Sequence, residues 1–502
     1  MADNYTSWKG IVDRRFTGRH LPEDKEFERR TRPETEDLVN LFLRPEDGTS
    51  GGTMQPDLRS TLLFASFAQW FTDSFLRTSH AFEFDDETGE VVTENDIPVR
   101  QPGREKINVS THEIDLCQIY GLNKKMTDKL RDPNNHGCLR SQVIEGEEFP
   151  DFILSRAPTK REKKLPIKTR FECLHDERVL RHIFKRTKTA KRYKMLFATG
   201  LEHSNATIGN ALFNTIFLRQ HNNIAREIAA SEPDWDSDRV FETTRNTMIV
   251  ILLNIVISDY IRHISPLGLP LSFQPGIAEA ETWYRRNRIH IEFNILYRWH
   301  GLVPSQFSFL PKPDDSADFR HNNEWLIEKG LSGAISAFSK ERAGMMVLGN
   351  TPRFLAPVKR DTITIMRSSR LQTYNAYRKR FGLKEAKDFS DITMDTSMAA
   401  ELSRLYGGRI DDVEWYIGMC AESHGRGMLM GDLMFYMVAH DAFTHALTNP
   451  LLSNEVFTQD TFGGVGWKYV QEVKSLKQVV ANVVDSSTVC EFAINGIHAD
   501  RA

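Results

Sequence analysis

A tyrosine and a histidine stand three positions apart near the end of residues 289–300, and these two residue types can do redox chemistry together. The segment is predicted to be helical, so Tyr297 and His300 would share one face with Cβ atoms about 5–6 Å apart. A histidine can ligate a haem iron from one side, and a tyrosine held nearby could lose an electron to the oxidised cofactor. The alternative is an aromatic-rich core helix whose histidine is hydrogen-bonded like other buried side chains.

The composition narrows the class of protein. The chain has 502 residues, of which 40% are apolar, enough for one large domain or two to three average ones. A net charge of −3 gives no reason to expect nucleic acid as a partner. No signal-peptide pattern opens the chain, and the longest apolar segment, 248–257, is too short for a transmembrane span. Five scattered cysteines form no zinc or disulfide spacing. We therefore expect a soluble protein in the cytoplasm.

The elements that must position the two residues are mostly helices. Apolar residues at three- and four-residue spacing predict helices at 197–230, 241–265, 280–298, 334–339 and 412–420. Residues 356–366 alternate apolar and polar, which predicts a short strand. The expected fold is therefore mainly α, with few short strands.

The two ends of the chain differ in character. Residues 1–60 are polar and rich in charge, proline and glycine, so we expect an N-terminal arm that wraps one large domain at 61–502. Within that domain residues 155–194 form an excursion, strongly basic over 159–194. One interpretation is a solvated surface segment. The other is a docking patch for an acidic partner or an anionic lipid surface.

Six short blocks carry a family resemblance. They are FAQWFTD at 67–73, IDLCQIYG at 114–121, FLRQHN at 217–222, EFNILYRWH at 292–300, LQTYNAYRKRFG at 371–382 and TFGG at 461–464. Together, and in this order, they resemble blocks of the prostaglandin-endoperoxide synthases (cyclooxygenases), which are animal haem peroxidases. The resemblance implies a haem-peroxidase-like helical domain with haem b as cofactor and with peroxide and dioxygen as co-substrates. The growth-factor-like and membrane-binding modules of cyclooxygenases have no counterpart in the sequence, so we expect a minimal form.

The resemblance also implies roles on the proximal side of the haem. His300 matches the iron ligand, and Asn294 and Tyr416 match residues that shape its surroundings. Tyr297 matches the tyrosine whose radical takes a hydrogen atom from the substrate. Tyr260 matches a second tyrosine that holds the first by a hydrogen bond.

The implied substrate channel is apolar. Phe71, Phe75, Phe293 and Leu296 would line it, although aromatic residues at helical spacing are also typical of plain core. Ala442 stands where cyclooxygenases have the serine that can be acetylated.

Other positions change the channel relative to the family. Val438 and His445 replace glycines that give the channel room, and Leu267 replaces a tyrosine of the carboxylate clamp. We therefore expect a narrower or differently shaped channel without the family's clamp for a carboxylate.

The distal side departs from the family as well. Gln69 fits the family's glutamine, but Asp73 stands where a histidine is expected one helical turn later. Asp73 could act as acid and base if desolvation raises its pKa, could form an ester to a haem methyl group, or could leave distal catalysis crippled. His203 is a candidate substitute base, and with His300, Asn294 and Tyr416 it completes the expected haem-binding residues.

Three functions follow from these residues. The first is a haem-dependent dioxygenase that uses a Tyr297 radical on an unsaturated fatty acid or other lipophilic substrate. The second is a haem peroxidase or peroxygenase with Asp73 as the distal acid and base. The third is a haem-binding protein without catalysis. A homodimer is compatible with each.

Overall fold

Helices dominate the chain. The structure, a computed structural model, describes residues 16–46, 52–75, 77, 92–94, 97–98, 107–159, 162, 164–185, 187–265, 274–282, 284, 287–310 and 318–494. Leu267, at the position of the clamp tyrosine, lies outside them. The described strands form only two-stranded pairs, so the mainly α prediction is confirmed. The boundary predicted between arm and domain at residue 60 stays a prediction.

The element bounds are as follows. The longer helices are α2 (Thr35–Phe42), α3 (Leu62–Thr72), α6 (Glu177–Phe184), α8 (Ile208–Ser231), α9 (Ser237–Ile255), α13 (Leu331–Lys340), α14 (Ala356–Ser368), α16 (Thr396–Leu405), α18 (Asp432–Leu447), α19 (Gln459–Glu472) and α20 (Leu476–Val483). The shorter helices are α4 (Cys117–Tyr120), α5 (Lys124–Leu130), α7 (Ala190–Lys194), α10 (Arg262–Ile264), α11 (Ile291–Leu296), α12 (Asn323–Lys329), α15 (Tyr374–Arg380) and α17 (Trp415–Ala421). The antiparallel strand pairs are β1 (Pro56–Thr61) with β6 (Arg342–Gly344), β2 (Thr93–Glu94) with β3 (Ile97–Pro98), and β4 (Ser141–Ile144) with β5 (Glu147–Pro150).

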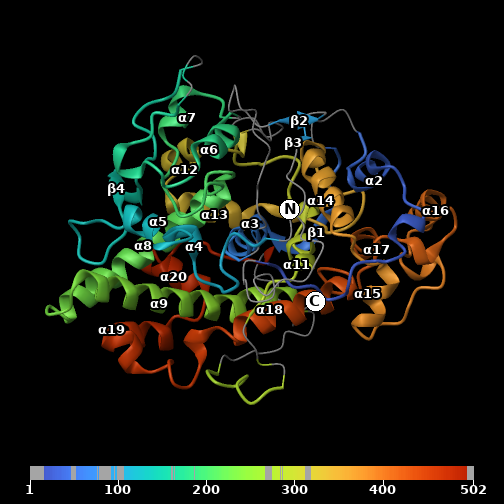
Figure 1. Ribbon diagram of the computed structural model, residues 1–502. Helices are drawn as coiled ribbons and strands as arrows, with labels where there is room; N and C mark the ends of the chain where they lie inside the picture. The colour runs from blue at the N-terminus through green and yellow to red at the C-terminus, as the bar shows by residue number, and fades with distance from the viewer. Residues whose placement is uncertain are drawn as a thin grey trace.

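Helices α8 and α9 form the centre of the larger half of the molecule. They pack on each other, α19 covers both, and α3 and α20 lie against α8 (Figure 1). Thr207 caps α8 by accepting a hydrogen bond from the Asn210 amide, so the helix begins there and not at residue 197 as predicted. The segment Ser237–Ile264 is long and apolar enough to cross a bilayer, but 83% of its most apolar window is buried by other parts of the protein. That burial is typical of a core helix.

The end of α9 changes its hydrogen-bonding pattern. A π-helical segment, Val256–Ile261, links α9 to α10, so the predicted helix at 241–265 is confirmed with a local widening. Such π segments re-aim side chains and are frequent at functional sites. Here the segment carries Tyr260, which is fully buried.

Two predicted elements are wrong. Residues 356–366 form the helix α14 and no strand, because their buried side chains recur at helical spacing at Lys359, Thr362, Ile363 and Met366. Residues 280–290 do not belong to a helix where they are described, and α11 covers only Ile291–Leu296 of the predicted 280–298.

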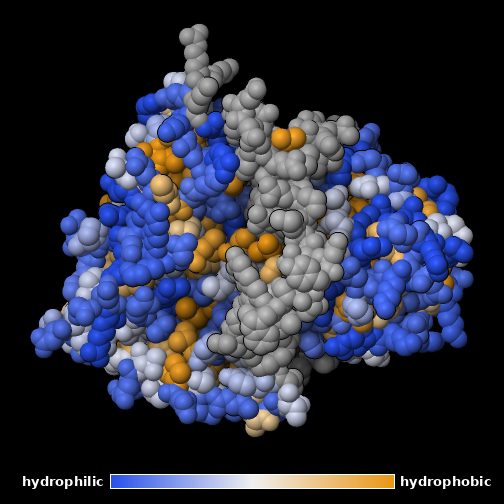
Figure 2. Space-filling model, viewed as in Figure 1, coloured by the Kyte–Doolittle hydropathy of each residue, from blue (hydrophilic) through white to orange (hydrophobic). Residues whose placement is uncertain are grey.

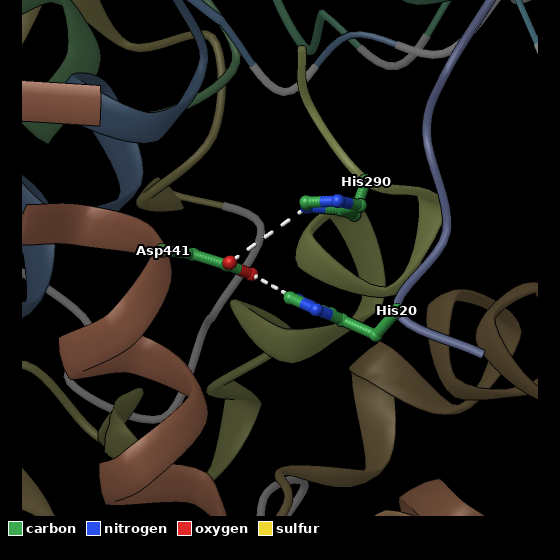
Figure 3. A group of neighbouring side chains, drawn as sticks. All are labelled: His20, His290 and Asp441. Atoms are coloured by element: carbon green, nitrogen blue, oxygen red, sulfur yellow. Dashed lines mark hydrogen bonds and ion pairs between the residues drawn. The ribbon is translucent and has the colours of Figure 1, made fainter. Parts of the chain in front are cut away.

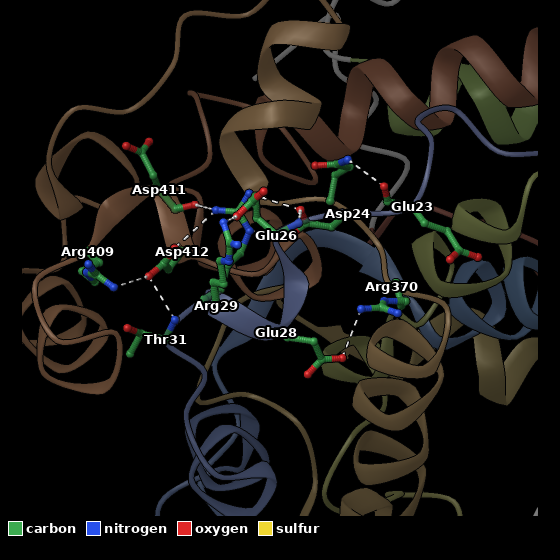
Figure 4. Close-up of polar contacts among 12 residues, drawn as sticks. Glu23, Asp24, Glu26, Glu28, Arg29, Thr31, Arg370, Arg409, Asp411 and Asp412 are labelled. Carbon is green, nitrogen blue, oxygen red and sulfur yellow. Dashed lines mark hydrogen bonds and ion pairs between the residues drawn. The ribbon is translucent and has the colours of Figure 1, made fainter.

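The N-terminal arm is tied to the smaller half, which contains α14 to α17 (Figure 1). Its helix α2 packs on α14 and buries Leu38, Val39 and Phe42. Before α2, the Arg30 guanidinium donates to Asp24 and Asp412, and the Thr31 amide donates to Asp412 at 3.0 Å (Figure 4). These polar contacts fix the part of the arm before α2 to the segment around Asp412.

Several basic residues in the described part of the excursion form ion pairs within the chain. Lys191 and Arg192 of α7 pair with Glu324 of α12, and Lys188 and Arg192 pair with Asp318. On the face in Figure 2 the described surface is mostly hydrophilic, with hydrophobic residues in several separate places. The ion pairs of Lys188, Lys191 and Arg192 favour the interpretation of a surface segment that is held against the rest of the protein. The alternative of an external docking patch stays a prediction.

Candidate active site

The segment that carries Tyr297 and His300 is a helix followed by a tight turn. Helix α11 ends at Leu296, Tyr297 leaves helical geometry with φ −90° and ψ 19°, and a 3₁₀ turn begins at His300. The prediction of one helix with both side chains on a single face is therefore wrong. The Tyr297 ring instead stacks on Trp299, with ring centroids 4.7 Å apart.

The His300 imidazole is uncommitted. Its Nδ1 is buried and has no hydrogen-bond partner among the residues that the structure describes. Desolvation, together with the positive charges of Lys359 and Arg298, holds the pKa of His300 well below its usual value. The ring is therefore neutral near pH 7 and can offer a lone pair to a metal ion.

Two long-range contacts fix the carbonyl of Arg298, two residues before His300. The Tyr416 hydroxyl donates to this oxygen at 2.8 Å, and the Lys359 ammonium donates to it at 3.3 Å and to the Tyr416 hydroxyl at 2.5 Å. Tyr416, predicted to shape the proximal side, thus touches the turn directly. Asn294 contributes its backbone carbonyl, which accepts from the Arg298 Nε at 3.3 Å.

A third contact holds the turn from the other side. The Arg44 guanidinium is fully buried and donates to the Val303 carbonyl at 2.7 Å and to the Ser305 hydroxyl at 2.6 Å. It also reaches the Gly301 carbonyl at 3.4 Å. Sequence reasoning missed Arg44 and Lys359, because neither belongs to a motif. A cationic position on the buried side of α14 was the only available signal for Lys359.

The two tyrosines lie together. Tyr260 and Tyr297 influence each other's pKa, and desolvation raises the pKa of both phenols. Neither hydroxyl has a hydrogen-bond partner of ordinary geometry in the described part of the chain. The predicted neighbourhood of the pair therefore exists, and the hydroxyl of each tyrosine acts on the pKa of the other as a hydrogen-bonding group does. The role predicted for this hydrogen bond stays a prediction.

The residues predicted to line the channel gather around these tyrosines. Phe71 packs edge-on to Tyr260, Phe71 packs on Phe75, Phe75 on Phe293, and Phe293 edge-on to Tyr297, with ring centroids 4.7–5.7 Å apart. Leu296 and Ala442 are buried. We call Phe71, Phe75, Phe293 and Tyr260 the aromatic wall.

Another imidazole extends the aromatic wall. His445 of α18 stacks on Phe293, with ring centroids 5.6 Å apart. Its side chain occupies space that a glycine would leave open, in line with the expectation of a narrower channel.

On helix α3 the distal candidates keep solvent contact. Gln69 is exposed and Asp73 is half-buried, although almost every other residue of α3 is buried. The Asn210 side chain donates to Asp73 at 3.1 Å. Desolvation raises the pKa of Asp73 to about 6, against the opposing charges of Arg77 and Arg298. The condition for proton transfer by this carboxyl near neutral pH is thus met.

His203 belongs to a polar group beside the distal helix. It lies 4.0 Å from Glu202, which also forms an ion pair with Arg77. Desolvation lowers the pKa of His203 to about 4, so the ring is neutral at pH 7. Arg77 acts on both Asp73 and His203, which puts the two candidate bases in one electrostatic neighbourhood.

One arginine connects the distal and the proximal side. Arg298 acts electrostatically on both Asp73 and His300, so the distal and the proximal group lie within reach of the same charge. Gln69 is exposed, and Asp73 and His300 are half-buried, so all three retain solvent contact. A neutral imidazole on the turn and a carboxyl with a raised pKa at the end of α3 are a donor set that fits a haem group.

Comparison with known proteins agrees with this geometry. A sequence model of the family "Animal haem peroxidase" matches residues 72–485. Prostaglandin G/H synthase 2 of Gallus gallus is 32% identical over 442 residues, covering 88% of this chain and 65% of that protein. Prostaglandin G/H synthase 1 of Mus musculus is 33% identical over 423 residues, covering 84% and 62%. The chain thus spans a little under two thirds of these relatives' length.

Solved structures share the fold. Peroxidase A from Dictyostelium discoideum superposes with a TM-score of 0.69 at 16% identity, covering 95% of this chain and 94% of that chain. Fatty acid alpha-dioxygenase from Arabidopsis thaliana gives a TM-score of 0.69 at 15% identity, covering 95% and 80%. The family model matches most of the length of this chain, so the chain belongs to the animal haem peroxidase family.

Proposed function

We propose that this protein is a haem-dependent dioxygenase that oxidises an unsaturated fatty acid or another lipophilic substrate through a radical on Tyr297. The observation that carries the proposal is the place of Tyr297, between the aromatic wall and the turn that holds His300. The names of the relatives, prostaglandin G/H synthase and fatty acid alpha-dioxygenase, support the same substrate class.

His300 is the residue that would hold haem b, since its imidazole is neutral and uncommitted. Haem, when bound, supplies the one-electron oxidation that converts Tyr297 to its radical. Tyr416 and Lys359 hold the Arg298 carbonyl and so fix the turn on which the histidine stands. Asn294 and His203 complete the proposed haem surroundings.

The chain's own residues carry the remaining steps. The Tyr297 oxygen takes a hydrogen atom from a substrate C–H bond, which leaves a carbon radical and an intact phenol. Dioxygen adds to the carbon, and the peroxyl radical takes the hydrogen atom back from Tyr297, so substrate and dioxygen combine to a hydroperoxide. The raised pKa keeps the resting phenol protonated. Phe71, Phe75, Phe293, Leu296 and Ala442 exclude water from the radicals.

The test is oxygen uptake by the haem-loaded protein with a series of unsaturated fatty acids. We expect Tyr297→Phe to abolish uptake while the Soret band stays in place. Tyr469→Phe is the matched control, because that hydroxyl bonds to Glu227 away from the site. Full turnover by Tyr297→Phe would remove Tyr297 from the reaction.

A second candidate function is a haem peroxidase or peroxygenase. Asp73 favours it, because a carboxyl with a pKa of about 6 can accept and return a proton near neutral pH. Gln69, exposed one turn earlier on α3, would help orient peroxide. Oxidation of small phenols without oxygen uptake would select this function. If peroxide leaves the Soret band of the haem-loaded protein unchanged, the protein would instead be a non-catalytic haem-binding protein.

We also propose a cytoplasmic location and, as an oligomeric state, a homodimer. All five cysteines lie in described residues and none is in a disulfide, which suits a reducing compartment. Light scattering of the purified protein tests the dimer, and fluorescent fusion to the chain tests the location.

A further inference from the structure

Three residues from distant parts of the chain meet beside α11. His20 comes from the N-terminal arm, His290 directly precedes α11, and Asp441 belongs to α18. Figure 3 shows both imidazole rings turned toward the carboxylate of Asp441. The His20 Nε2 lies 2.8 Å from one carboxylate oxygen, and the His290 Nδ1 lies 3.7 Å from the other. One ligand atom from each residue falls within 4.8 Å of the other two.

We propose that His20, His290 and Asp441 form a binding site for a divalent transition-metal ion, with Zn²⁺ as the expected ion. Imidazole and carboxylate are ligands that zinc prefers, and tetrahedral bonds of about 2.0–2.1 Å separate neighbouring ligand atoms by about 3.4 Å. The distances of 2.8 and 3.7 Å lie on either side of that value. Small side-chain rotations would therefore suffice.

A fourth ligand is within reach. The His440 Nδ1 lies 3.0 Å from an oxygen of Asp441, and the His440 ring meets His20 edge-on at 5.4 Å. His440 is the most exposed of the four, with 44% of its side chain accessible. The ion would enter from solvent past His440. This residue would complete a site of three histidines and one carboxylate. If His440 does not bind, a water molecule would take the fourth ligand position.

Burial distinguishes this group from a chance surface cluster. The His20 and Asp441 side chains are each only 2% exposed. A buried carboxylate requires compensating positive charge, and three imidazoles face this one. A metal ion supplies that charge in the same way as a protonated histidine.

The ion would replace a proton. Without metal, His20 and Asp441 share a hydrogen bond, and the His20 ring stacks on His290 with centroids 4.1 Å apart and planes 24° apart. On binding, the proton between His20 and Asp441 is released, and both rings tilt so that each lone pair points at the ion. The competing outcome is that the three residues bind no metal ion and that only a shared proton joins His20 to Asp441.

The site would clamp the arm to the two helices beside Tyr297. The arm already meets this region through backbone bonds, from the Gly18 amide to the Ile289 carbonyl at 2.7 Å and from the Ile291 amide to Gly18 at 3.0 Å. Zinc would add a cross-link between residues 20, 290 and 441, and the expected consequence is a higher thermal stability and slower proteolysis of the arm. This role is independent of the proposed oxidation chemistry.

The experiment measures zinc in the haem-loaded, full-length protein after dialysis against micromolar Zn²⁺, with iron measured in parallel. We expect about one zinc per chain in the wild type and a loss of that zinc in His290→Gln and Asp441→Asn. His136→Gln, which removes an exposed histidine elsewhere, is the control and should keep the zinc. Wild-type protein without retained zinc, or zinc retained in both site variants, would overturn the proposal.

A second measurement does not depend on variant folding. X-ray absorption of the zinc-loaded wild type should show two or three imidazole ligands with nitrogen and oxygen neighbours only. Sulfur neighbours would place the ion at a cysteine and refute the site.

The melting temperature should rise with zinc in the wild type and in His136→Gln, but not in His290→Gln.

Discussion

The Lys359 ammonium lies 2.5 Å from the Tyr416 hydroxyl, and both groups donate to the carbonyl of Arg298, two residues before His300. Lys359 is 2% exposed and packs over the rings of Phe42 and Tyr416. A lysine on α14 and a tyrosine on α17 thus fix the turn that presents the candidate iron ligand. The buried cation also opposes protonation of His300.

Removing this cation should change how stability depends on pH. Desolvation lowers the pKa of Lys359 from 10.5 to about 8, so between these values the unfolded chain binds more protons than the folded one. The contribution of Lys359 to wild-type stability, measured as the difference between wild type and Lys359→Met, should therefore rise from pH 8 to 10.5, by about 3 kcal/mol at most. Lys359→Met should lack this rise in urea titrations of the haem-free protein. Lys340→Met, at an exposed position, should behave as wild type; a rise that persists in Lys359→Met would assign it to another group.

Arg44 should be essential for the same turn. Arg44→Met leaves the Val303 carbonyl and the Ser305 and Asn350 side chains without its donors. We expect the free energy of unfolding to fall by about 3 kcal/mol and haem to dissociate faster, as measured by transfer to a haem acceptor. Arg404→Met, which loses an exposed ion pair with Glu401, should change neither by much. Unchanged haem dissociation in Arg44→Met would show that the turn holds without it.

Local sequence patterns predicted the helical fold well and the turn poorly. The charge of Arg298 acts on Asp73 after α3 and on His300, but the shared haem site that the family resemblance implied stays a prediction. The break after Leu296 was not predictable from periodicity, because partners far away in sequence fix it: Tyr416 is 118 residues from Arg298, and Arg44 is 259 residues from Val303. The misreading of 356–366 has a related cause, since a short alternating run also satisfies helical spacing.

The metal-site candidate shows the same limit. His20 and Asp441 are 421 residues apart, and no motif contains either of them. Sequence spacing can identify ligands within one helix or loop, but it cannot bring together an arm, a helix start and a distant helix. Only the folded chain does so.

The role of Tyr260 can be separated from that of Tyr297. Tyr260→Phe keeps the ring that packs on Phe67 and Phe71 and removes only the hydroxyl. Loss of one interaction of about 1 kcal/mol should lower oxygen uptake by roughly tenfold or less, with an altered line shape of the tyrosyl radical in electron paramagnetic resonance. Tyr120→Phe removes a buried hydroxyl that bonds to His221 and is the matched control. Complete loss of uptake in Tyr260→Phe would instead make Tyr260 a radical site itself.

Asp73 should govern the pH dependence of the reaction with peroxide. With a pKa of about 6, the carboxylate form that accepts a proton increases from pH 5 to 7. The rate of the peroxide-induced Soret change, followed by stopped flow, should rise over this range in the wild type. Asp73→Asn should slow it by about 100-fold or more and remove the rise, since a positioned base typically contributes 10²–10⁴-fold. Asp128→Asn, an exposed side chain on α5, is the control. An unchanged rate in Asp73→Asn would move proton transfer to another group, and His203, neutral and next to Glu202, is the residue to replace next.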